Sequence, residues 1–347
     1  MGYIFGKKNI LITGGAGFLG SHLCEELVKD NNVICLDNLM GGGGDIKNIE
    51  YLLQKQNFKF IKQDINQAFD LENFPEAQDF KISIQGIQEI YHLACPTTAK
   101  NFMQTRMETL WANSVGMINI LEIAKKYKAK ILTGSSSVIY GPRKNDSLYF
   151  KESDPGSVNS VDPRACYDEG KRFAETCSVT YREVDGVDTK IARIFRTYGP
   201  RLALFDGQMI SDFILQALNN KPLIVYGDQN FSTSLCYIDD IVQGLIMMMN
   251  SKEAGPINFG QREEYKLADV AKKIIELTGS QSKIIFKDPL PFMRPLGLPD
   301  ISLAKEKLNW FPVVGLDDGL AKTIEYVKAN RMLLQPLVER YDQDLNN

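Results

Sequence analysis

The sequence predicts an α/β fold: a doubly wound parallel sheet with helices on both faces, followed by a smaller C-terminal domain of mixed α/β structure. Three observations favour this fold. Short apolar runs alternate with helical patterns over the first half of the chain, a glycine-rich turn follows the first run, and proline interrupts shorter elements after about residue 200. Because a strand, a helix and a second strand form a parallel unit, their repetition indicates one sheet covered on both sides.

Six short runs rich in β-branched or aromatic residues are predicted as strands. In chain order they are Asn9–Thr13, Val33–Asp37, Phe58–Gln63, Glu89–Leu93, Lys130–Thr133 and Lys190–Phe195. Helical patterns lie between most of these runs, notably over Ser21–Lys29 and Met107–Tyr127. We therefore predict one domain over residues 1–200 and a second over residues 201–347, interleaved with the first.

The composition is that of a soluble globular protein and argues against several classes of function. Of the 347 residues, 44% are hydrophobic and 24% are charged, and the net charge is −3, which disfavours a general nucleic-acid or membrane surface. No apolar run reaches the roughly 18 residues of a membrane span, and the N-terminus carries no signal-peptide pattern, so we expect a cytoplasmic protein. The six cysteines form no C-x-x-C pair and there are two histidines, so no metal site is predicted.

The glycine-rich turn has the sequence context of a dinucleotide site. The segment TGGAGFLG at 13–20 follows a predicted strand and opens a helix. Gly14 and Gly17 allow the backbone to approach a pyrophosphate, Gly20 allows the helix to pack on the strand, and the helix N-terminus offers N–H groups to the phosphates. Asp37 ends the second strand, where its carboxylate can bind both ribose hydroxyls and repel a 2′-phosphate. The pattern predicts a Rossmann domain that binds NAD rather than NADP; the alternative is a glycine turn that binds nothing.

Further candidate cofactor contacts lie beside this turn and at the ends of the next strands. They are Phe18 and Leu19 in the first helix, Asn38 after Asp37, Asp64 and Ile65 after the third strand, and Leu93 and Ala94 after the fourth. Of these, Asp64 and Ile65 are expected near the adenine.

A second group of residues has the pattern of a catalytic base and its support. Tyr167 and Lys171 stand four residues apart in a helical stretch, so both side chains lie on one helix face. A free tyrosine titrates near about 10, but a nearby ammonium and a positive nicotinamide favour the phenolate and lower its pKa. Tyr167 is predicted to take a proton from a sugar hydroxyl while hydrogen leaves the carbon as hydride, and Lys171 to hold the nicotinamide ribose as well. The alternative is a surface tyrosine and lysine at helical spacing.

These motifs occur together in one known order. TGGAGFLG, Asp37, HLA at 92–94, Asn113, SSSVIYG at 135–141, Tyr167 with Lys171, and RIFRTYGPR at 193–201 follow one another along the chain. Over roughly residues 9 to 325, the chain resembles the extended short-chain dehydrogenase/reductase family that acts on nucleotide-sugars. Within that family, RACYDEGKRFAE at 164–175 and DGQMISDFILQAL at 206–218 are most similar to UDP-glucuronate decarboxylases.

The resemblance implies a fold, a cofactor, partners and residue roles. It implies a Rossmann domain with a small C-terminal substrate domain, tightly held NAD, and oxidation at C4 of a sugar linked to UDP or GDP. It implies that Ser136 is the hydroxyl partner of Tyr167. It also implies a homodimer or tetramer, in which the Met107–Tyr127 helix and the Tyr/Lys helix of two chains form a four-helix bundle.

The segment after the fifth strand departs from the family pattern. The decarboxylases resemble S-T-S-E-V-Y-G and the dehydratases S-T-D-E-V-Y-G, whereas this chain has Ser137 at the dehydratase aspartate position and Val138 at the glutamate position. Valine can serve neither as an acid nor as a base. The pattern is therefore closer to that of 4-epimerases, which need only the serine, tyrosine and lysine.

Two further departures concern positive charge. The family's FNTYGPR has Arg196 in place of asparagine, and its TRSF segment has Thr233 in place of arginine. We hypothesise that Arg196 supplies the charge for the substrate diphosphate that Thr233 lost, since arginine binds such groups as a fork; the alternative is that Arg196 faces solvent. Arg294 matches a second diphosphate arginine of the family. The predicted substrate-binding residues are Ser137, Arg196, Arg201, Tyr226 and Arg294.

Three hypotheses of function follow. The first is NAD-dependent oxidation at C4 of a nucleotide-sugar, as a 4-dehydrogenase or a 4-epimerase, with Tyr167, Lys171 and Ser136 as catalytic residues. The second is a UDP-glucuronate decarboxylase that uses another acid or none, because a β-keto acid loses CO₂ readily. The third is a non-catalytic NAD-binding regulatory protein, which the intact Tyr/Lys/Ser set disfavours.

Overall fold

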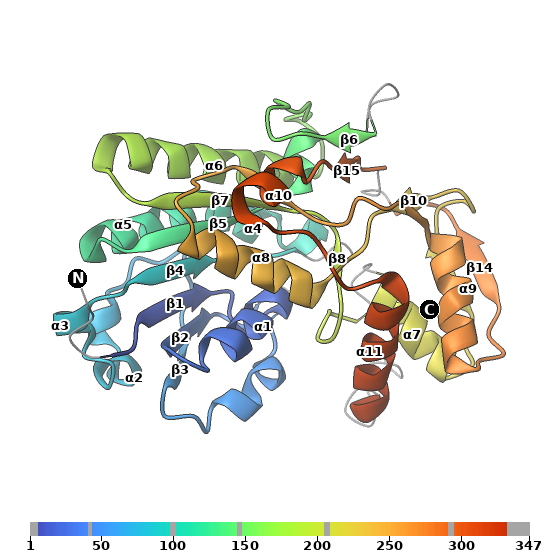
Figure 1. Ribbon diagram of the computed structural model, residues 1–347, viewed down its shortest axis with the longest axis horizontal. Coiled ribbons are helices and arrows are strands. Elements are labelled where there is room, and N and C mark those ends of the chain that lie inside the picture. Colours follow the sequence, from blue (N-terminus) through green and yellow to red (C-terminus); the bar gives the residue numbers. More distant parts are fainter. Residues whose placement is uncertain are drawn as a thin grey trace.

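A seven-stranded parallel sheet forms the centre of the computed structural model, which describes residues 6–40, 44–97, 102–143, 148–204, 209–290 and 295–331. The strand order is β12-β7-β5-β4-β1-β2-β3 (Figure 1). The strands are β1 (Asn9–Thr13), β2 (Asn32–Asp37), β3 (Phe58–Lys62), β4 (Glu89–His92), β5 (Lys130–Ser136), β7 (Thr189–Ile194) and β12 (Ile257–Phe259). The doubly wound parallel sheet predicted from the sequence is confirmed.

The two faces of the sheet are covered by different helices. Helices α1 (Phe18–Leu27) and α8 (Ile238–Asn250) pack on one face, and α5 (Met117–Tyr127) and α6 (Ala165–Asp185) on the other. Side chains alternate across each strand, so Ile10 and Ile12 of β1 belong to the core under α1 and α8, while Leu11 belongs to the core under α5 and α6. This burial on both faces explains why the strands read as continuous apolar runs.

Some predicted boundaries were wrong in ways that matter for the site. Strand β5 continues to Ser136 rather than ending at Thr133, so the serine-rich segment begins inside the sheet. Helix α1 begins directly after Gly17 rather than at Ser21. The predicted Met107–Tyr127 helix consists of α4 (Arg106–Trp111), a π-helical turn at Ala112–Gly116, and α5.

The chain after residue 200 contributes to two regions. Helix α8 and strand β12 belong to the central sheet, whereas a separate unit lies at the right of Figure 1. That unit contains α7 (Ile210–Leu218), β9 (Leu223–Tyr226), α9 (Leu267–Thr278), β14 (Ile284–Lys287) and α11 (Leu316–Ala329), with β14 parallel to β9. The division into domains at residue 200 stays a prediction.

The remaining elements are short. They are α2 (Pro75–Gln78), α3 (Ile82–Gln85), β6 (Tyr149–Phe150), β8 (Thr197–Tyr198), β10 (Ser232–Thr233), β11 (Cys236–Tyr237), β13 (Tyr265–Lys266), β15 (Leu298–Pro299) and α10 (Ser302–Leu308), with 3-10 turns at Ile46–Asn48, Glu50–Leu52, Leu71–Asn73, Phe102–Gln104 and Ser137–Tyr140. The ladder of β8 with β11 joins the segment after β7 to the start of α8.

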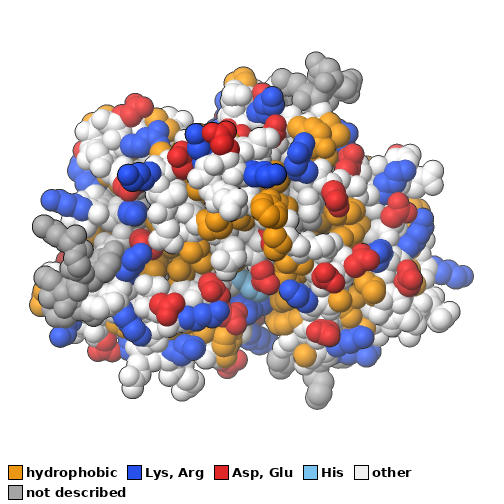
Figure 2. All heavy atoms as spheres, viewed as in Figure 1, with side chains coloured by type: hydrophobic (Ala, Val, Ile, Leu, Met, Phe, Trp, Pro, Cys, Tyr) orange, Lys and Arg blue, Asp and Glu red, His pale blue; other side chains and the backbone are white. Residues whose placement is uncertain are grey.

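The surface mixes charges of both signs. Figure 2 shows blue and red side chains interspersed over the face that it presents. Of the helices in the described ranges, none is both long and apolar enough to cross a membrane.

Candidate active site

A cavity of about 500 Å³ opens at the carboxyl ends of the central strands. Its lining includes Gly14 after β1, Leu93 after β4, Ser136 at the end of β5 and Ile194 at the end of β7. The strand order reverses between β1 and β4, and loops that diverge at such a reversal leave a crevice for a ligand. The volume suits an organic ligand of moderate size.

The glycine turn forms one wall of the cavity and cannot accommodate side chains. Gly14 has a φ of +70°, and a Cβ there would lie 2.8 Å from the backbone nitrogen of Ala94. A Cβ at Gly20 would lie 2.1 Å from the carbonyl oxygen of Gly14. Phe18, Leu19 and Gly20 line the cavity, so the N-terminus of α1 opens onto it. Close backbone approach and free helix N–H groups suit a pyrophosphate.

Asp37 lies at the end of β2, with its side chain buried at the cavity wall. One carboxylate oxygen accepts a hydrogen bond from the backbone N–H of Ala16 (3.0 Å) and the other from that of Leu39 (2.8 Å). Burial raises the pKa of Asp37, while these backbone donors oppose the rise. A carboxylate held in this way retains acceptor capacity for ribose hydroxyls and repels a phosphate on the ribose. The turn and Asp37 together fit the adenosine diphosphate half of NAD.

All the predicted cofactor residues line this one cavity. They are Gly14, Gly17, Phe18, Leu19, Asp37, Asn38, Asp64, Ile65, Leu93, Ala94 and Lys171. Sequence reasoning missed their neighbours Gln63, Asn66, Cys95 and Pro96, which also line it. These residues follow the same strand ends, so proximity in sequence was the signal that could have identified them.

Tyr167 and Lys171 face the cavity from α6. The Lys171 ammonium donates a 2.9 Å hydrogen bond to the backbone carbonyl of Gly134 in β5, and it lies 5.9 Å from the ring centre of Tyr167. Lys171 is buried, and its spacing from Tyr167 places both on one face of the helix. The positive charge is therefore held close to the phenol.

The pKa of Tyr167 reflects opposing effects. Burial raises it, while the charges of Lys171 and Arg164 and a hydrogen bond with the Ser136 side chain lower it. Burial is the largest of these effects, so the net shift of the pKa is upward. The predicted lowering also counts the charge of a bound nicotinamide, and it stays a prediction. The effect of Lys171 has the predicted sign. Ser136 meets the phenol because β5 extends as far as this residue.

Two arginines line the cavity near Tyr167. The Arg164 guanidinium lies 5.2 Å from the ring centre of Tyr167 and forms an ion pair with Asp168 (Nε to Oδ1, 3.1 Å). Arg196 forms no ion pair with any residue in the described ranges. Burial and the nearby charge of Arg164 lower the pKa of Arg196 to about 10. Because this pKa lies above neutral pH, Arg196 stays protonated there. Its side chain lines the cavity instead of facing bulk solvent.

The 3-10 turn that follows Ser136 contributes no acidic side chain to the cavity wall. Ser137 and Val138 both line the cavity from the 3-10 turn Ser137–Tyr140, and both are buried. The hydroxyl of Ser136 accepts the backbone N–H of Val138 at 3.4 Å and caps this turn. An apolar side chain thus stands where the resemblance led us to look for an acid.

The other predicted substrate residues lie elsewhere. Arg201 pairs with Glu25 and lies 5.4 Å from the ring centre of Tyr51, outside the cavity lining. Tyr226 ends β9 and is also outside the lining. Arg294 lies outside the described residues. Thr233 donates to the carbonyl of Ser234 (3.3 Å) and does not line the cavity.

Within the described ranges, no cluster of three or more His, Cys, Asp or Glu side chains could hold a metal ion.

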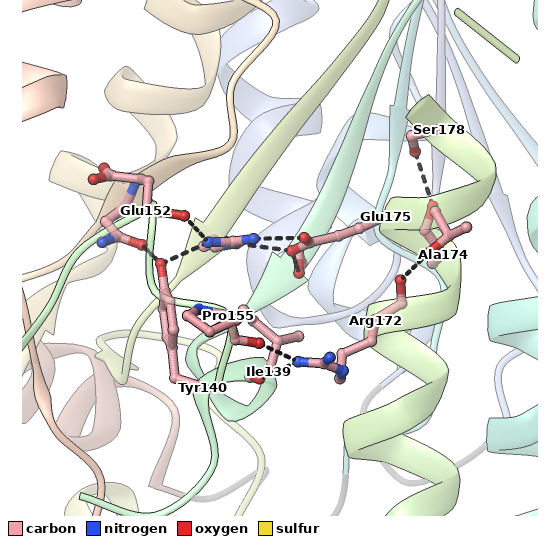
Figure 3. A network of polar contacts seen from close by, with 12 residues as sticks. Ile139, Tyr140, Glu152, Pro155, Arg172, Ala174, Glu175 and Ser178 are labelled. Atoms are coloured by element: carbon pink, nitrogen blue, oxygen red, sulfur yellow. Dashed lines mark hydrogen bonds and ion pairs between the residues drawn. The ribbon is translucent and has the colours of Figure 1, made fainter. Parts of the chain in front are cut away.

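A buried ionic network supports the site and was not predicted. Arg193 of β7 binds Glu175 of α6 through two bonds, Nη2 to Oε2 (2.8 Å) and Nε to Oε1 (3.0 Å). Its Nη1 also donates to the hydroxyl of Tyr140 (2.9 Å). Figure 3 labels Glu175 and Tyr140, and the guanidinium drawn between them carries these bonds. Glu175 in turn accepts the hydroxyl of Ser135 at 2.5 Å. The network thereby ties α6, which carries Tyr167, to the strand end that carries Ser136. A charged residue inside an apolar strand run was the available signal.

The fold and cavity agree with comparisons to known proteins. The family model described as GDP-mannose 4,6 dehydratase matches residues 11–323. UDP-glucuronic acid decarboxylase 1 of Xenopus tropicalis is 39% identical over 325 residues, which are 93% of this chain and 72% of the relative.

Solved structures of other proteins share the fold of this chain. An epimerase of Methanothermobacter thermautotrophicus superposes with a TM-score of 0.82 at 26% identity, over 96% of this chain and 95% of that one. The UDP-glucuronic acid 4-epimerase of Bacillus cereus, solved in complex with UDP-glucuronic acid and NAD, superposes with a TM-score of 0.78 at 27% identity, over 92% of this chain and 99% of that one. The chain therefore belongs to the GDP-mannose 4,6 dehydratase family and is an NAD-dependent nucleotide-sugar enzyme of the extended short-chain dehydrogenases/reductases.

Proposed function

We propose that the protein oxidises UDP-glucuronic acid at C4 and then releases the C6 carboxyl group as CO₂. The observation that carries the chemistry is the meeting of Tyr167, Lys171 and Ser136 in the cavity that the glycine turn and Asp37 also line. The choice of substrate rests on similarity, since a UDP-glucuronic acid decarboxylase is 39% identical over 93% of the chain.

The first step is alcohol oxidation. When bound, NAD supplies the acceptor for the hydrogen that leaves C4 as hydride. The phenolate of Tyr167 takes the proton of the C4 hydroxyl, and Ser136 donates a hydrogen bond to the same oxygen. The ammonium of Lys171, held by Gly134, favours the phenolate by its charge. Deprotonation and hydride loss together give a C4 ketone.

The second step needs no acid at position 138. The C4 ketone is β to the C6 carboxylate, so the electron pair of the breaking C5–C6 bond moves into an enolate whose charge rests on the C4 oxygen. Tyr167, now protonated, and Ser136 both donate to this oxygen and stabilise its charge. A proton from water would add to C5 and restore the C4 ketone, and the hydride removed in the first step would return to C4, so the whole reaction would be redox-neutral. Val138 is therefore compatible with decarboxylation.

A second candidate is 4-epimerisation of the same substrate. The apolar Val138 favours it, because epimerisation requires only the tyrosine, lysine and serine and a ketone that is reduced from its other face. The Bacillus cereus neighbour is a UDP-glucuronic acid 4-epimerase. Both candidates share the substrate and the oxidation at C4, and they differ in whether the carboxylate is retained.

One assay separates these outcomes. The purified protein is incubated with NAD and, in parallel, UDP-glucuronic acid, UDP-glucose and GDP-mannose. Loss of the mass of CO₂ identifies decarboxylation, an unchanged mass with an altered NMR spectrum identifies epimerisation, and loss of two hydrogens identifies a released 4-keto product. Tyr167→Phe is the control and is expected to abolish each outcome. Turnover of UDP-glucose or GDP-mannose without turnover of UDP-glucuronic acid would contradict the proposal.

We also propose a homodimer built on the outer face of α4, α5 and α6. Met107, Leu110, Trp111 and Phe173 leave between 43% and 51% of their surfaces exposed there. Contiguous exposed apolar groups on neighbouring helices are typical of a protein interface. The family resemblance assigns this face to a bundle of four helices from two chains.

A further inference from the structure

Among the described residues, one arginine of the active-site cavity has no acidic side chain within ion-pair distance. We propose that Arg196 binds the carboxylate of the sugar and so selects uronic acids over neutral sugars. This inference rests on the proposed function, because it concerns the same cavity and the same substrate class. It also replaces the diphosphate role that the sequence suggested for Arg196.

Arg196 lines the part of the cavity beside the end of β5, where Ser136 lies. In the ladder between β5 and β7, Ser136 pairs with Ile194, and Arg196 follows Ile194 by two residues. Both Ile194 and Arg196 line the cavity, as do Phe195 and Thr197. The arginine therefore lies just beyond the end of β7, the strand next to the one that carries the hydroxyl partner of the base.

Arg164 and Arg196 differ in whether an acidic side chain pairs with them. Arg164 is neutralised by Asp168 at 3.1 Å, whereas Arg196 has no such partner among the described residues. Val138, from the neighbouring turn, contributes an apolar side chain to the same cavity. A guanidinium partly removed from water and left without an anion is unfavourable, so the site gains most from a ligand that carries negative charge at this point.

The position of the base indicates which anion this is. Arg164 lies against the ring of Tyr167, both line the cavity with Arg196, and Arg196 follows the residue that pairs with Ser136 by two positions, so the two arginines and the base share one region of the cavity. Tyr167 must reach the C4 hydroxyl. In a uronic acid the carboxylate is attached to C5, next to C4, whereas the diphosphate leaves from C1 on the opposite side of the ring. A cation in the region of the base therefore suits the carboxylate, which guanidinium binds through two parallel hydrogen bonds.

The test measures binding without turnover. NAD-loaded Tyr167→Phe protein, in which chemistry is blocked, is titrated calorimetrically with UDP-glucuronic acid and with UDP-glucose, which share the nucleotide and the diphosphate. The same titrations are made in Tyr167→Phe/Arg196→Asn, and in Tyr167→Phe/Arg262→Asn as a matched loss of an exposed arginine outside the cavity lining. We expect Arg196→Asn to weaken UDP-glucuronic acid about 10- to 100-fold and UDP-glucose by less than about threefold, as for loss of a charge-assisted hydrogen bond.

Each result decides between explanations. Equal weakening of both ligands would assign Arg196 to the diphosphate and overturn the inference, as would no weakening of either. Equal affinity of the Arg196-containing protein for the two ligands would overturn carboxylate recognition even if the enzyme converts UDP-glucuronic acid. An Arg196-dependent preference for the acid, without turnover of that acid by the wild-type protein, would support the inference and contradict the proposed function instead.

Discussion

The ammonium of Lys171 donates a 2.9 Å hydrogen bond to the backbone carbonyl of Gly134. Gly134 lies in β5, two residues before Ser136, so this bond joins the helix that carries the base to the strand that carries its hydroxyl partner. A Cβ at Gly134 would lie 2.7 Å from Cδ2 of Leu93, which shows how closely the neighbouring segment packs. The charge of Lys171 is thus held by backbone geometry at a fixed place near Tyr167.

Lys171→Met is expected to lower turnover about 100-fold and to move its pH dependence upward. The charge of Lys171 lowers the pKa of Tyr167 against the effect of burial, so its removal raises that pKa and reduces the phenolate fraction at neutral pH. The measurement is kcat against pH. Lys62→Met, at an exposed position of β3, is the matched control. A profile unchanged in pH would show that the ammonium does not act on the phenol.

Asp37→Asn is expected to weaken NAD about tenfold and to reduce discrimination against NADP. The substitution keeps the shape of the side chain but removes the charge that repels a ribose phosphate, and it exchanges one oxygen that accepts a backbone N–H for a donor. Fluorescence titration with NAD and NADP measures both effects. Asp64→Asn is an informative comparison, because Asp64 lines the same cavity after β3. An unchanged ratio of the two affinities would remove Asp37 from the ribose site.

Local patterns predicted most of the sheet because each strand buried on both faces carries its own apolar run. Strand β12 was missed because its three residues, Ile257–Phe259, become a strand only through pairing with β7. The ladders of two residues, such as Thr197–Tyr198 with Cys236–Tyr237, are likewise defined by partners far away in sequence. The segment CYDEGKRFAE at 166–175, which carries Tyr167 and Lys171, was predicted as helical from its local pattern, and it lies inside helix Ala165–Asp185.

In the candidate site too, the residues that follow a short local pattern were predictable and those defined by distant partners were not. The glycine turn, Asp37 and the Tyr/Lys pair are recognised from short spacings, and the structure brings them into one cavity. The pairing of Arg201 with Glu25 joins residues 176 positions apart, and no local pattern announces it. Arg196 has no ion-pair partner in the part of the chain that the structure describes, and this too depends on its surroundings in three dimensions, so sequence reasoning could assign its positive charge but not its ligand.

Glu175→Gln is expected to destabilise the protein by about 3 kcal/mol, because it leaves the buried guanidinium of Arg193 without a counter-charge. Urea unfolding measures this change, and the double substitution with Arg193→Met should cost less than the sum of the two single changes. Asp269→Asn removes an exposed pair with Lys272 and should change stability by less than about 0.5 kcal/mol. Additive effects of Glu175 and Arg193 would show that the bonds in Figure 3 do not couple them.

Trp111→Glu is expected to convert a dimer into monomers. Trp111 is 45% exposed on α4, beside Met107 and Leu110, so a second chain packed on this face would bury the new carboxylate without a partner, which is strongly unfavourable. Size-exclusion chromatography with light scattering measures the mass at several protein concentrations. Ile84→Glu, at an exposed apolar residue of α3, is the matched control and should keep the mass of the parent. If the parent protein itself has the mass of one chain at micromolar concentration, the proposed dimer is wrong, and if both variants remain dimeric, the interface lies on another face.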